Sequence, residues 1–238
     1  MIIVTGGAGF IGSNLVKALN ERGRNDIIIV DDLTDGRKVR NLTNLDYFDY
    51  IDCIDFDNAI ADGTFDCGPI DVVFHQGACA DTMEYDGRYM MKNNFEGSKN
   101  LFHFCQERRI PFIYASSAST YGYGRNGFRE DPACEEALNP YAYSKLFMDR
   151  YVRKFENQLE SQVVGLRYFN VYGPNEGHKD KMASLVRQMF YKNQETGEIT
   201  LFEGTDGYEN GGQTRDFIYV KDVVNVNLFF WEHPELSG

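Results

Sequence analysis

Near the N-terminus stands Thr5-Gly6-Gly7-Ala8-Gly9-Phe10-Ile11-Gly12, directly after the apolar run Ile2-Ile3-Val4. The stretch satisfies two glycine spacings at once, Gly7-x-Gly9-x-x-Gly12 and Gly6-x-x-Gly9-x-x-Gly12. Glycines so spaced permit a tight turn, close approach of the backbone to a pyrophosphate, and close packing of a helix on a strand. The stretch therefore predicts the first strand, loop and helix of a dinucleotide-binding fold, with the helix N-terminus facing the phosphates.

Acidic and basic side chains next to the second predicted strand bear on the choice of dinucleotide. Asp31 and Asp32 end that strand, which spans residues 26–31. An acidic group in this position normally binds the ribose hydroxyls, which favours NAD. Arg37 and Lys38 follow closely and are placed to hold the 2′-phosphate of NADP. On these residues alone, both cofactors remain open.

Apolar runs of strand length alternate with amphipathic segments of helix length along the chain. This alternation predicts an α/β fold, a Rossmann-like doubly wound parallel sheet covered by helices on both faces. The predicted strands are residues 2–5, 26–31, 71–75, 110–115 and 163–169. The predicted helices are residues 10–21, 88–108, 141–157 and 182–192. Residues 35–65 show no clear pattern, and residues 122–133 and 204–214 are predicted surface loops.

Composition excludes several classes of protein. The 238 residues suffice for one large domain, or one domain and part of a second. With 24 basic and 36 acidic side chains the net charge is −12, which disfavours nucleic acid as a partner. No apolar run is long enough to span a bilayer. The five cysteines lack a C-x-x-C pair and the four histidines lack ligand spacing, so we expect no metal site and a reducing cytoplasm.

Polar groups in the middle of the chain predict acid–base chemistry. Ser117 follows the predicted strand at residues 110–115, where the carboxyl end of the sheet binds ligands. Tyr141 and Lys145 are four residues apart and share one helix face, whereas Tyr143 lies off that face. We expect the lysine to lower the pKa of the phenol and Ser117 to hold the reacting oxygen. The trio predicts proton transfer on a carbinol while a nicotinamide moves the hydride.

The glycine loop, Ser117 and Tyr141-x-x-x-Lys145 together resemble the extended short-chain dehydrogenase/reductases that act on nucleotide sugars. Within that group the chain is similar, from Met1 to Gly238, to the ADP-L-glycero-D-manno-heptose 6-epimerases. The stretches that carry this narrower resemblance are residues 1–14, 74–79, 89–94, 170–179 with 182–184, and 201–204. The resemblance implies an NADP-binding Rossmann domain over residues 1–170. It also implies a partial substrate-binding region over residues 171–238, interleaved with a last Rossmann strand and helix.

The implied reaction inverts C6 of ADP-D-glycero-D-manno-heptose through transient oxidation to a 6-keto intermediate, for the supply of lipopolysaccharide core heptose. The resemblance makes Tyr141 one acid/base group and Lys179 the second, with Ser117 and Lys145 assisting. The implied cofactor contacts, to a tightly held NADP, are Gly6, Gly9, Phe10, Ile11, Gly12, Asp31, Asp32, Lys38, Gln76, Gly77, Ala78, Cys79, Ala80, Asn93, Lys145, Val171 and His178. The implied substrate contacts are Ser117, Asn170, Lys181, Gln188, Phe202, Glu203, Gly204, Thr205 and Arg215. The family also implies a homo-oligomer, a pentamer.

Departures from the family pattern leave alternatives open. Asp180-Lys181 follows Lys179 where relatives carry a small residue, which adds a competing lysine and an acid able to pair with Lys179. The family also continues past Gly238 with a segment that closes over the sugar, so we expect this chain alone to turn over poorly. A UDP-hexose 4-epimerase would share the trio without needing Lys179. A 4,6-dehydratase is disfavoured because no acid pair follows Ser117. A non-catalytic NADP-binding protein is the alternative of another class.

Overall fold

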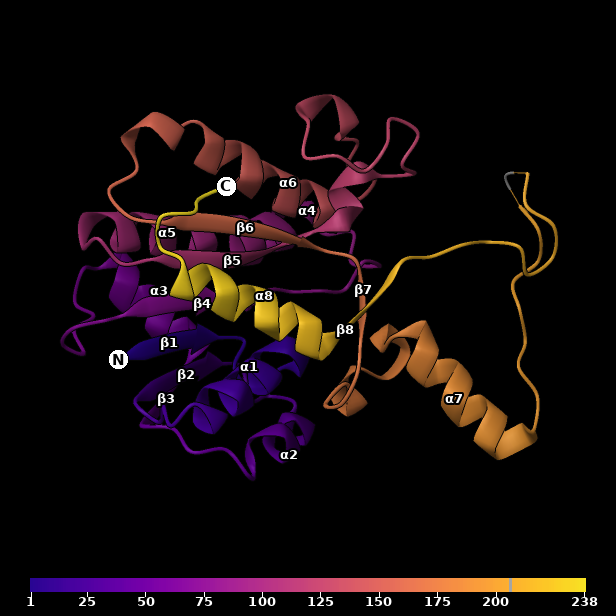
Figure 1. The fold of residues 1–238 in the computed structure, drawn as a ribbon, viewed down its shortest axis with the longest axis horizontal. Coiled ribbons are helices and arrows are strands. Elements are labelled where there is room, and N and C mark those ends of the chain that lie inside the picture. Colours follow the sequence, from indigo (N-terminus) through magenta and orange to yellow (C-terminus); the bar gives the residue numbers. More distant parts are fainter. Residues whose placement is uncertain (206) are drawn as a thin grey trace.

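A six-stranded parallel sheet forms the centre of the protein, in the order β3-β2-β1-β4-β5-β6 (Figure 1). The computed structural model describes residues 1–205 and 207–238. The strands are β1 (Ile2–Thr5), β2 (Ile27–Asp31), β3 (Asp49–Asp52), β4 (Val72–His75), β5 (Phe112–Ser117) and β6 (Val163–Tyr168). Strand order reverses between β1 and β4, and this point is where doubly wound sheets bind ligands. The predicted Rossmann-like sheet is therefore confirmed.

Helices cover both faces of the sheet because successive strand residues point to opposite sides. Ile3 packs with Phe56 and Leu101, from helices on one face. Its neighbours Ile2 and Val4 pack with helices on the other face. The helices are α1 (Phe10–Glu21), α2 (Val39–Leu42), α3 (Cys53–Ala61), α4 (Gly87–Met90), α5 (Gly97–Glu107), α6 (Pro140–Arg153), α7 (Leu185–Thr196) and α8 (Val220–Glu232). Thus α3, α5 and α6 lie on one face, and α1 and α8 on the other.

Several predicted boundaries move. The helix predicted at residues 88–108 is α4, a π-helical segment Met91–Glu96, and α5 in succession. Residues 35–65, left unassigned, contain a 3₁₀ turn, α2, the edge strand β3 and α3. The strand predicted at residues 110–115 is β5 and extends to Ser117. The helix predicted at residues 182–192 begins only at Leu185. Residues 177–182 before that helix form a separate 3₁₀ segment.

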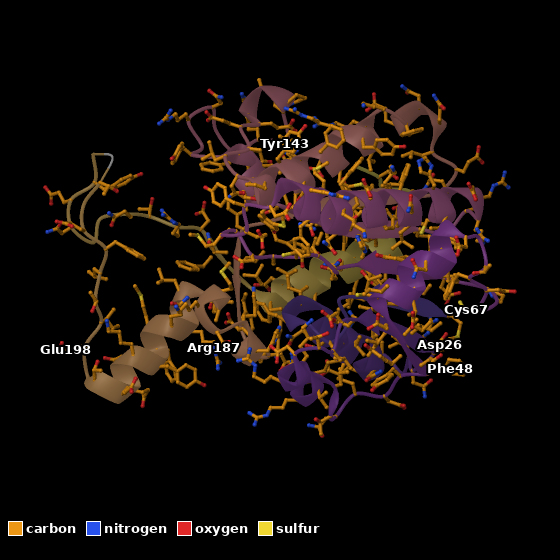
Figure 2. The ribbon with its side chains drawn as sticks, turned by 180° about the vertical axis from the view of Figure 1, so that it is seen from behind. Asp26, Phe48, Cys67, Tyr143, Arg187 and Glu198 are labelled. Atoms are coloured by element: carbon orange, nitrogen blue, oxygen red, sulfur yellow. The ribbon has the colours of Figure 1, made fainter. Side chains whose placement is uncertain are left out.

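A small second sheet lies beside the main one. It pairs β7 (Asn170–Tyr172) in parallel with β8 (Phe217–Tyr219). Between these strands the chain forms α7 and an extended segment, which both stand away from the main sheet (Figure 1). Arg187 and Glu198 mark that projecting part in Figure 2. The predicted loop at 204–214 contains no helix or strand in its described residues, and Asp206 lies outside them. The division at residues 170/171 stays a prediction.

Across the described ranges, every helix is too short or too polar to cross a membrane.

Candidate active site

A cavity of about 1170 Å³ opens at the carboxyl ends of the central strands. Ser117 lines it from the end of β5, and Tyr141 and Lys145 line it from α6. Other predicted site residues that line it are Phe10, Ile11, Gln76, Ala78, Ala80, Asn170, Val171, Lys179, Thr205 and Arg215. Predicted residues outside the lining are Gly6, Gly9, Gly12, Asp31, Asp32, Lys38, Gly77, Cys79, Asn93, His178, Lys181, Gln188, Phe202, Glu203 and Gly204. The fold thus brings the predicted catalytic residues to one cavity.

The glycine loop forms a cradle that a side chain would fill. Gly6 has φ +66°, and a Cβ there would lie 2.7 Å from the amide nitrogen of Gly77. A Cβ at Gly12 would lie 2.1 Å from the carbonyl oxygen of Gly6, so helix α1 can approach the loop only with glycine present. No side chain caps the start of α1, so its first amides are available to an anion. These residues fit the pyrophosphate of a nicotinamide dinucleotide.

Asp31 is fixed between the glycine loop and a lysine. Its Oδ2 accepts a hydrogen bond from the Ala8 amide at 2.8 Å, and Lys38 Nζ donates to its Oδ1 at 2.8 Å. Asp31 is nearly buried and Lys38 lies beside it at the end of β2. Arg37 is engaged elsewhere, because its guanidinium pairs with both Asp35 and Asp180. Of the two predicted cations, only Lys38 thus sits against the acid that ends β2.

Asn94, which was not among the predicted site residues, holds the loop after β4. Its side chain accepts from the Cys79 amide at 2.8 Å and donates to the Cys79 carbonyl at 2.9 Å. It also donates to Ser144 of α6 at 3.1 Å. The predicted residue, Asn93, is exposed and donates instead to the Tyr89 carbonyl of its own helix. Asn94 lies in the π-helical segment, and such segments frequently occur at functional sites.

His75 belongs to the scaffold beneath this loop. Its ring nitrogens lie 2.7 Å from Thr5 Oγ1 and 2.7 Å from Ser98 Oγ. Burial, with a smaller contribution from the nearby charge of Lys145, lowers the pKa of His75 to about 3. The imidazole is therefore neutral and connects β1, β4 and α5 through hydrogen bonds.

Ser117, Tyr141 and Lys145 meet at the end of β5. Burial raises the pKa of Tyr141, while a hydrogen bond from Ser117 opposes that rise. Lys145 donates to the Ala115 carbonyl at 2.9 Å, and burial lowers its pKa to about 8. The expected lowering of the tyrosine pKa by Lys145 is not found, because the ammonium is directed to the β5 backbone. The phenol therefore holds its proton near neutral pH.

The second tyrosine of the motif faces away from the cavity. Tyr143 is 46% exposed and its ring stacks on Phe147 at 5.7 Å between centroids. Figure 2 shows Tyr143 on the outer surface of α6. The helical spacing argument, which preferred Tyr141 to Tyr143, agrees with these positions.

Lys179 lines the cavity from the 3₁₀ segment before α7. Its Nζ lies 5.7 Å from the centre of the Phe10 ring, and burial lowers its pKa despite the opposing charge of Glu176. Lys181 is exposed and outside the cavity. Asp180, which the sequence makes able to pair with Lys179, instead accepts hydrogen bonds from Arg37 at both its oxygens, at 2.7–2.8 Å.

The predicted substrate contacts fall into two groups. Asn170, Thr205 and Arg215 line the cavity, and Asn170 is held there by donation to the Asp216 carbonyl at 2.9 Å. Phe202, by contrast, is 59% exposed on the projecting segment. The remaining members make local contacts: Gln188 donates to the Lys181 and Ala183 carbonyls, Gly204 donates to Asn210, and the Glu203 carbonyl accepts from Gln213.

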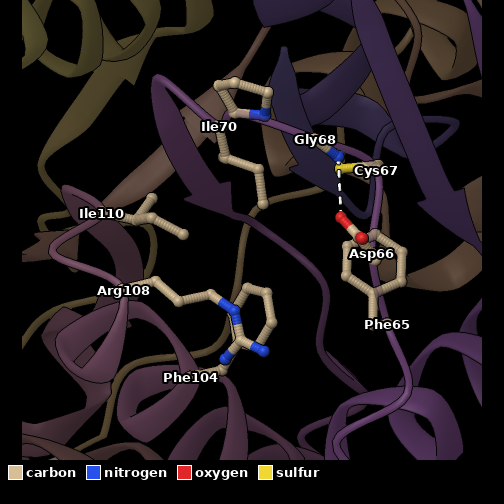
Figure 3. A pocket seen from close by; sticks show the side chains of 9 residues that line it. Phe65, Asp66, Cys67, Gly68, Ile70, Phe104, Arg108 and Ile110 are labelled. Atoms are coloured by element: carbon tan, nitrogen blue, oxygen red, sulfur yellow. Dashed lines mark hydrogen bonds between the residues drawn. The ribbon is translucent and has the colours of Figure 1, made fainter.

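A second hollow, of about 410 Å³, lies near the amino ends of β4 and β5, and Figure 3 shows the side chains that line it. Its lining, residues 65–70 with Phe104, Arg108 and Ile110, comes from segments that precede β4 and β5. The Arg108 guanidinium lies 4.1 Å from the centre of the Phe104 ring. The amino ends of parallel strands are not where such sheets bind ligands, so the larger cavity is the candidate site.

Comparison with known proteins supports this assignment. The model of the NAD dependent epimerase/dehydratase family matches residues 2–238. The chain is 57% identical over 238 residues to ADP-L-glycero-D-manno-heptose-6-epimerase of Alkalilimnicola ehrlichii, covering 100% of this chain and 74% of that protein. It is 52% identical over 236 residues to the enzyme of the same name from Thiobacillus denitrificans, covering 99% and 70%.

Solved structures agree with the sequence relatives. The Helicobacter pylori ADP-L-glycero-D-manno-heptose-6-epimerase superimposes with a TM-score of 0.81 at 32% identity, over 97% of this chain and 73% of that one. The UDP-glucose 4-epimerase of Thermotoga maritima gives 0.75 at 30% identity, over 95% and 72%. The fold, the cavity and the glycine cradle are therefore those of a nicotinamide-dependent enzyme of nucleotide sugars, and the chain belongs to the NAD dependent epimerase/dehydratase family.

Proposed function

We propose that the protein inverts C6 of ADP-D-glycero-D-manno-heptose to give the L-glycero epimer, with no net oxidation. The observation that carries the proposal is the presence of two proton-transfer groups, Tyr141 and Lys179, in one cavity beside the glycine cradle. The heptose comes from the relatives' names, which are the same at 57%, 52% and 32% identity.

A bound nicotinamide would remove a hydride from C6 and return it. The C6 hydroxyl loses its proton as the hydride leaves, and a neighbouring base must accept that proton. Ser117 and Tyr141 both line the cavity, and we assign the exchange of this proton to the Tyr141 oxygen, which accepts it when ionised and returns it as the neutral phenol. Lys145, buried one helical turn from Tyr141, donates to the Ala115 carbonyl and so holds β5, which ends at Ser117, against the catalytic helix.

Inversion requires a second proton-transfer group. The hydride must return to the opposite face of the 6-keto intermediate, so the carbonyl rotates within the site and its oxygen meets a different partner. Lys179 lines the same cavity from a different element, the 3₁₀ segment before α7. Its burial lowers its pKa, which gives the amine a larger neutral fraction and suits it to exchange a proton.

We infer that the cofactor is NADP. Lys38 supports this assignment, because its ammonium binds Asp31 and the Asp32 carbonyl at the end of β2, where the adenosine ribose of such cofactors lies. Arg37, paired with Asp35 and Asp180, contributes less.

Replacing Lys38 by Glu should lower the preference for NADP over NAD on the order of tenfold or more, since it reverses a charge beside the 2′-phosphate. Titration of the cofactor-free protein with each dinucleotide measures this ratio. The matched control is Arg40→Glu, which changes an exposed cation on α2 and should leave the ratio near its original value. An unchanged ratio in Lys38→Glu would remove this lysine from cofactor selection.

The substrate is tested by incubating the protein with ADP-D-glycero-D-manno-heptose and, separately, with UDP-galactose, and resolving the products. The proposal predicts the L-glycero epimer from the first and no conversion of the second. Conversion of UDP-galactose alone would support the alternative of a UDP-hexose 4-epimerase.

We further propose a homo-oligomer in a reducing cytoplasm, in keeping with the family. All five cysteines are free thiols, among them the buried Cys105 and Cys134, which is usual where glutathione keeps thiols reduced.

A further inference from the structure

A third ionisable residue continues the catalytic face of α6. Asp149 lies one turn beyond Lys145, as Lys145 lies one turn beyond Tyr141, so the three share one side of the helix. Asp149 is 7% exposed, and three groups donate to its carboxylate. They are Tyr114 OH at 2.9 Å, Ser116 Oγ at 2.8 Å and Arg167 Nε at 2.9 Å. Three donors fix a buried carboxylate in place and satisfy its hydrogen-bonding capacity.

These contacts connect the helix to the strand that carries Ser117. Tyr114 and Ser116 belong to β5, and Ser116 immediately precedes Ser117. Lys145 donates to the Ala115 carbonyl of the same strand. The strand residues 114–116 are therefore bound to α6 at both Lys145 and Asp149. The serine and tyrosine that meet substrate in the proposed reaction come from the two elements joined in this way.

The charge of Asp149 also bears on Lys145. Arg167 joins Asp149 to a second carboxylate, Glu135, whose side chain is fully buried beneath Arg153 and Arg150. This cluster joins three arginines to two carboxylates, so removal of Asp149 would leave Glu135 as its one remaining anion. The other ionisable groups near Lys145 are the neutral His75, the Cys79 thiol and the Tyr141 phenol.

We propose that Asp149 is a positioning residue that holds the Ser117 strand against the catalytic helix and places a negative charge one helical turn from Lys145. The expected effect on catalysis rests on the proposed function. The expected effect of the Asp149 charge on Lys145 does not. Burial lowers the pKa of Lys145 to about 8, and the Asp149 carboxylate opposes that fall. Without this carboxylate the lysine would lose its proton at lower pH.

The titration of Lys145 tests the proposal without any sugar substrate. Lysine Cε resonances of the ¹³C-labelled protein are followed against pH, and Lys145→Arg identifies the signal. In Asp149→Asn the midpoint for Lys145 should fall by about one pH unit or more. In Asp149→Glu, which restores the charge, it should return toward the original value. Tyr114→Phe removes a donor but leaves the Asp149 carboxylate in the protein, so the midpoint should move much less.

A second variant covers the case in which Asp149→Asn does not fold. Arg167→Gln removes the cation that competes for Asp149, so the Lys145 midpoint should rise. An unchanged midpoint in both Asp149→Asn and Arg167→Gln, or in the one that folds, would overturn the proposal. The alkaline limb of the epimerisation pH profile should shift by the same amount as the midpoint. A shifted titration in a protein that does not epimerise the heptose would contradict the proposed function alone.

Discussion

Replacing Tyr141 by Phe is expected to reduce epimerisation about 10²–10⁴-fold, the usual cost of losing a general acid/base group. The substitution removes one oxygen and leaves the ring to fill the cavity wall beside Ser117. Cofactor should remain bound, because the glycine cradle and the loop after β4 are untouched. The measurement is the rate of product formation per mole of retained nicotinamide, which separates lost chemistry from lost cofactor.

Tyr143→Phe is the matched control, since that side chain is exposed and stacks on Phe147 outside the cavity. It should keep close to full activity. If Tyr143→Phe were inactive and Tyr141→Phe active, the assignment of the proton-transfer tyrosine would be reversed.

Replacing Lys179 by Met is expected to reduce turnover by a comparable factor, about 10²–10⁴-fold. Methionine preserves much of the packing against Phe10 but cannot carry a proton. The rate at saturating substrate is the quantity to measure, because a binding contact would affect KM more than kcat.

Lys181→Met is the comparison variant for Lys179. Lys181 is exposed, and the family resemblance gives it a substrate contact, so its loss should raise KM and leave kcat near normal. Full activity in Lys179→Met with an inactive Lys181→Met would make Lys181 the second base. Full activity in both lysine variants would contradict a two-base mechanism.

Local patterns were sufficient to predict most of the main sheet. The glycine loop predicted β1 and α1 to the residue, because strand, turn and helix each impose their own residue types within 20 positions. In the structure, Ile2 and Ile3 lie on opposite faces of the sheet, as the alternation of side chains along a strand requires. The edge strand β3 was missed because its four residues, Asp49–Asp52, are half-exposed and include two aspartates, so no apolar alternation marks them.

Long-range pairings explain what the sequence did not predict in the site. Arg37 meets Asp180 across 143 positions, and no local pattern records that contact. Within the π-helical segment it is Asn94, and not Asn93, that bonds to the loop after β4, and this contact joins residues 15 positions apart. The helical spacing from Tyr141 to Lys145 extends to Asp149, but only the fold shows that β5 donors surround that carboxylate.

The central claim is that a hydride leaves C6 and returns to the opposite face of the same carbon. It is tested most directly with ADP-D-glycero-D-manno-heptose that carries deuterium at C6, with the product analysed by NMR and mass spectrometry. The proposed mechanism predicts an L-glycero product that keeps its deuterium at C6, with no exchange into water. Loss of that deuterium to solvent during inversion, or an unchanged configuration at C6, would contradict it.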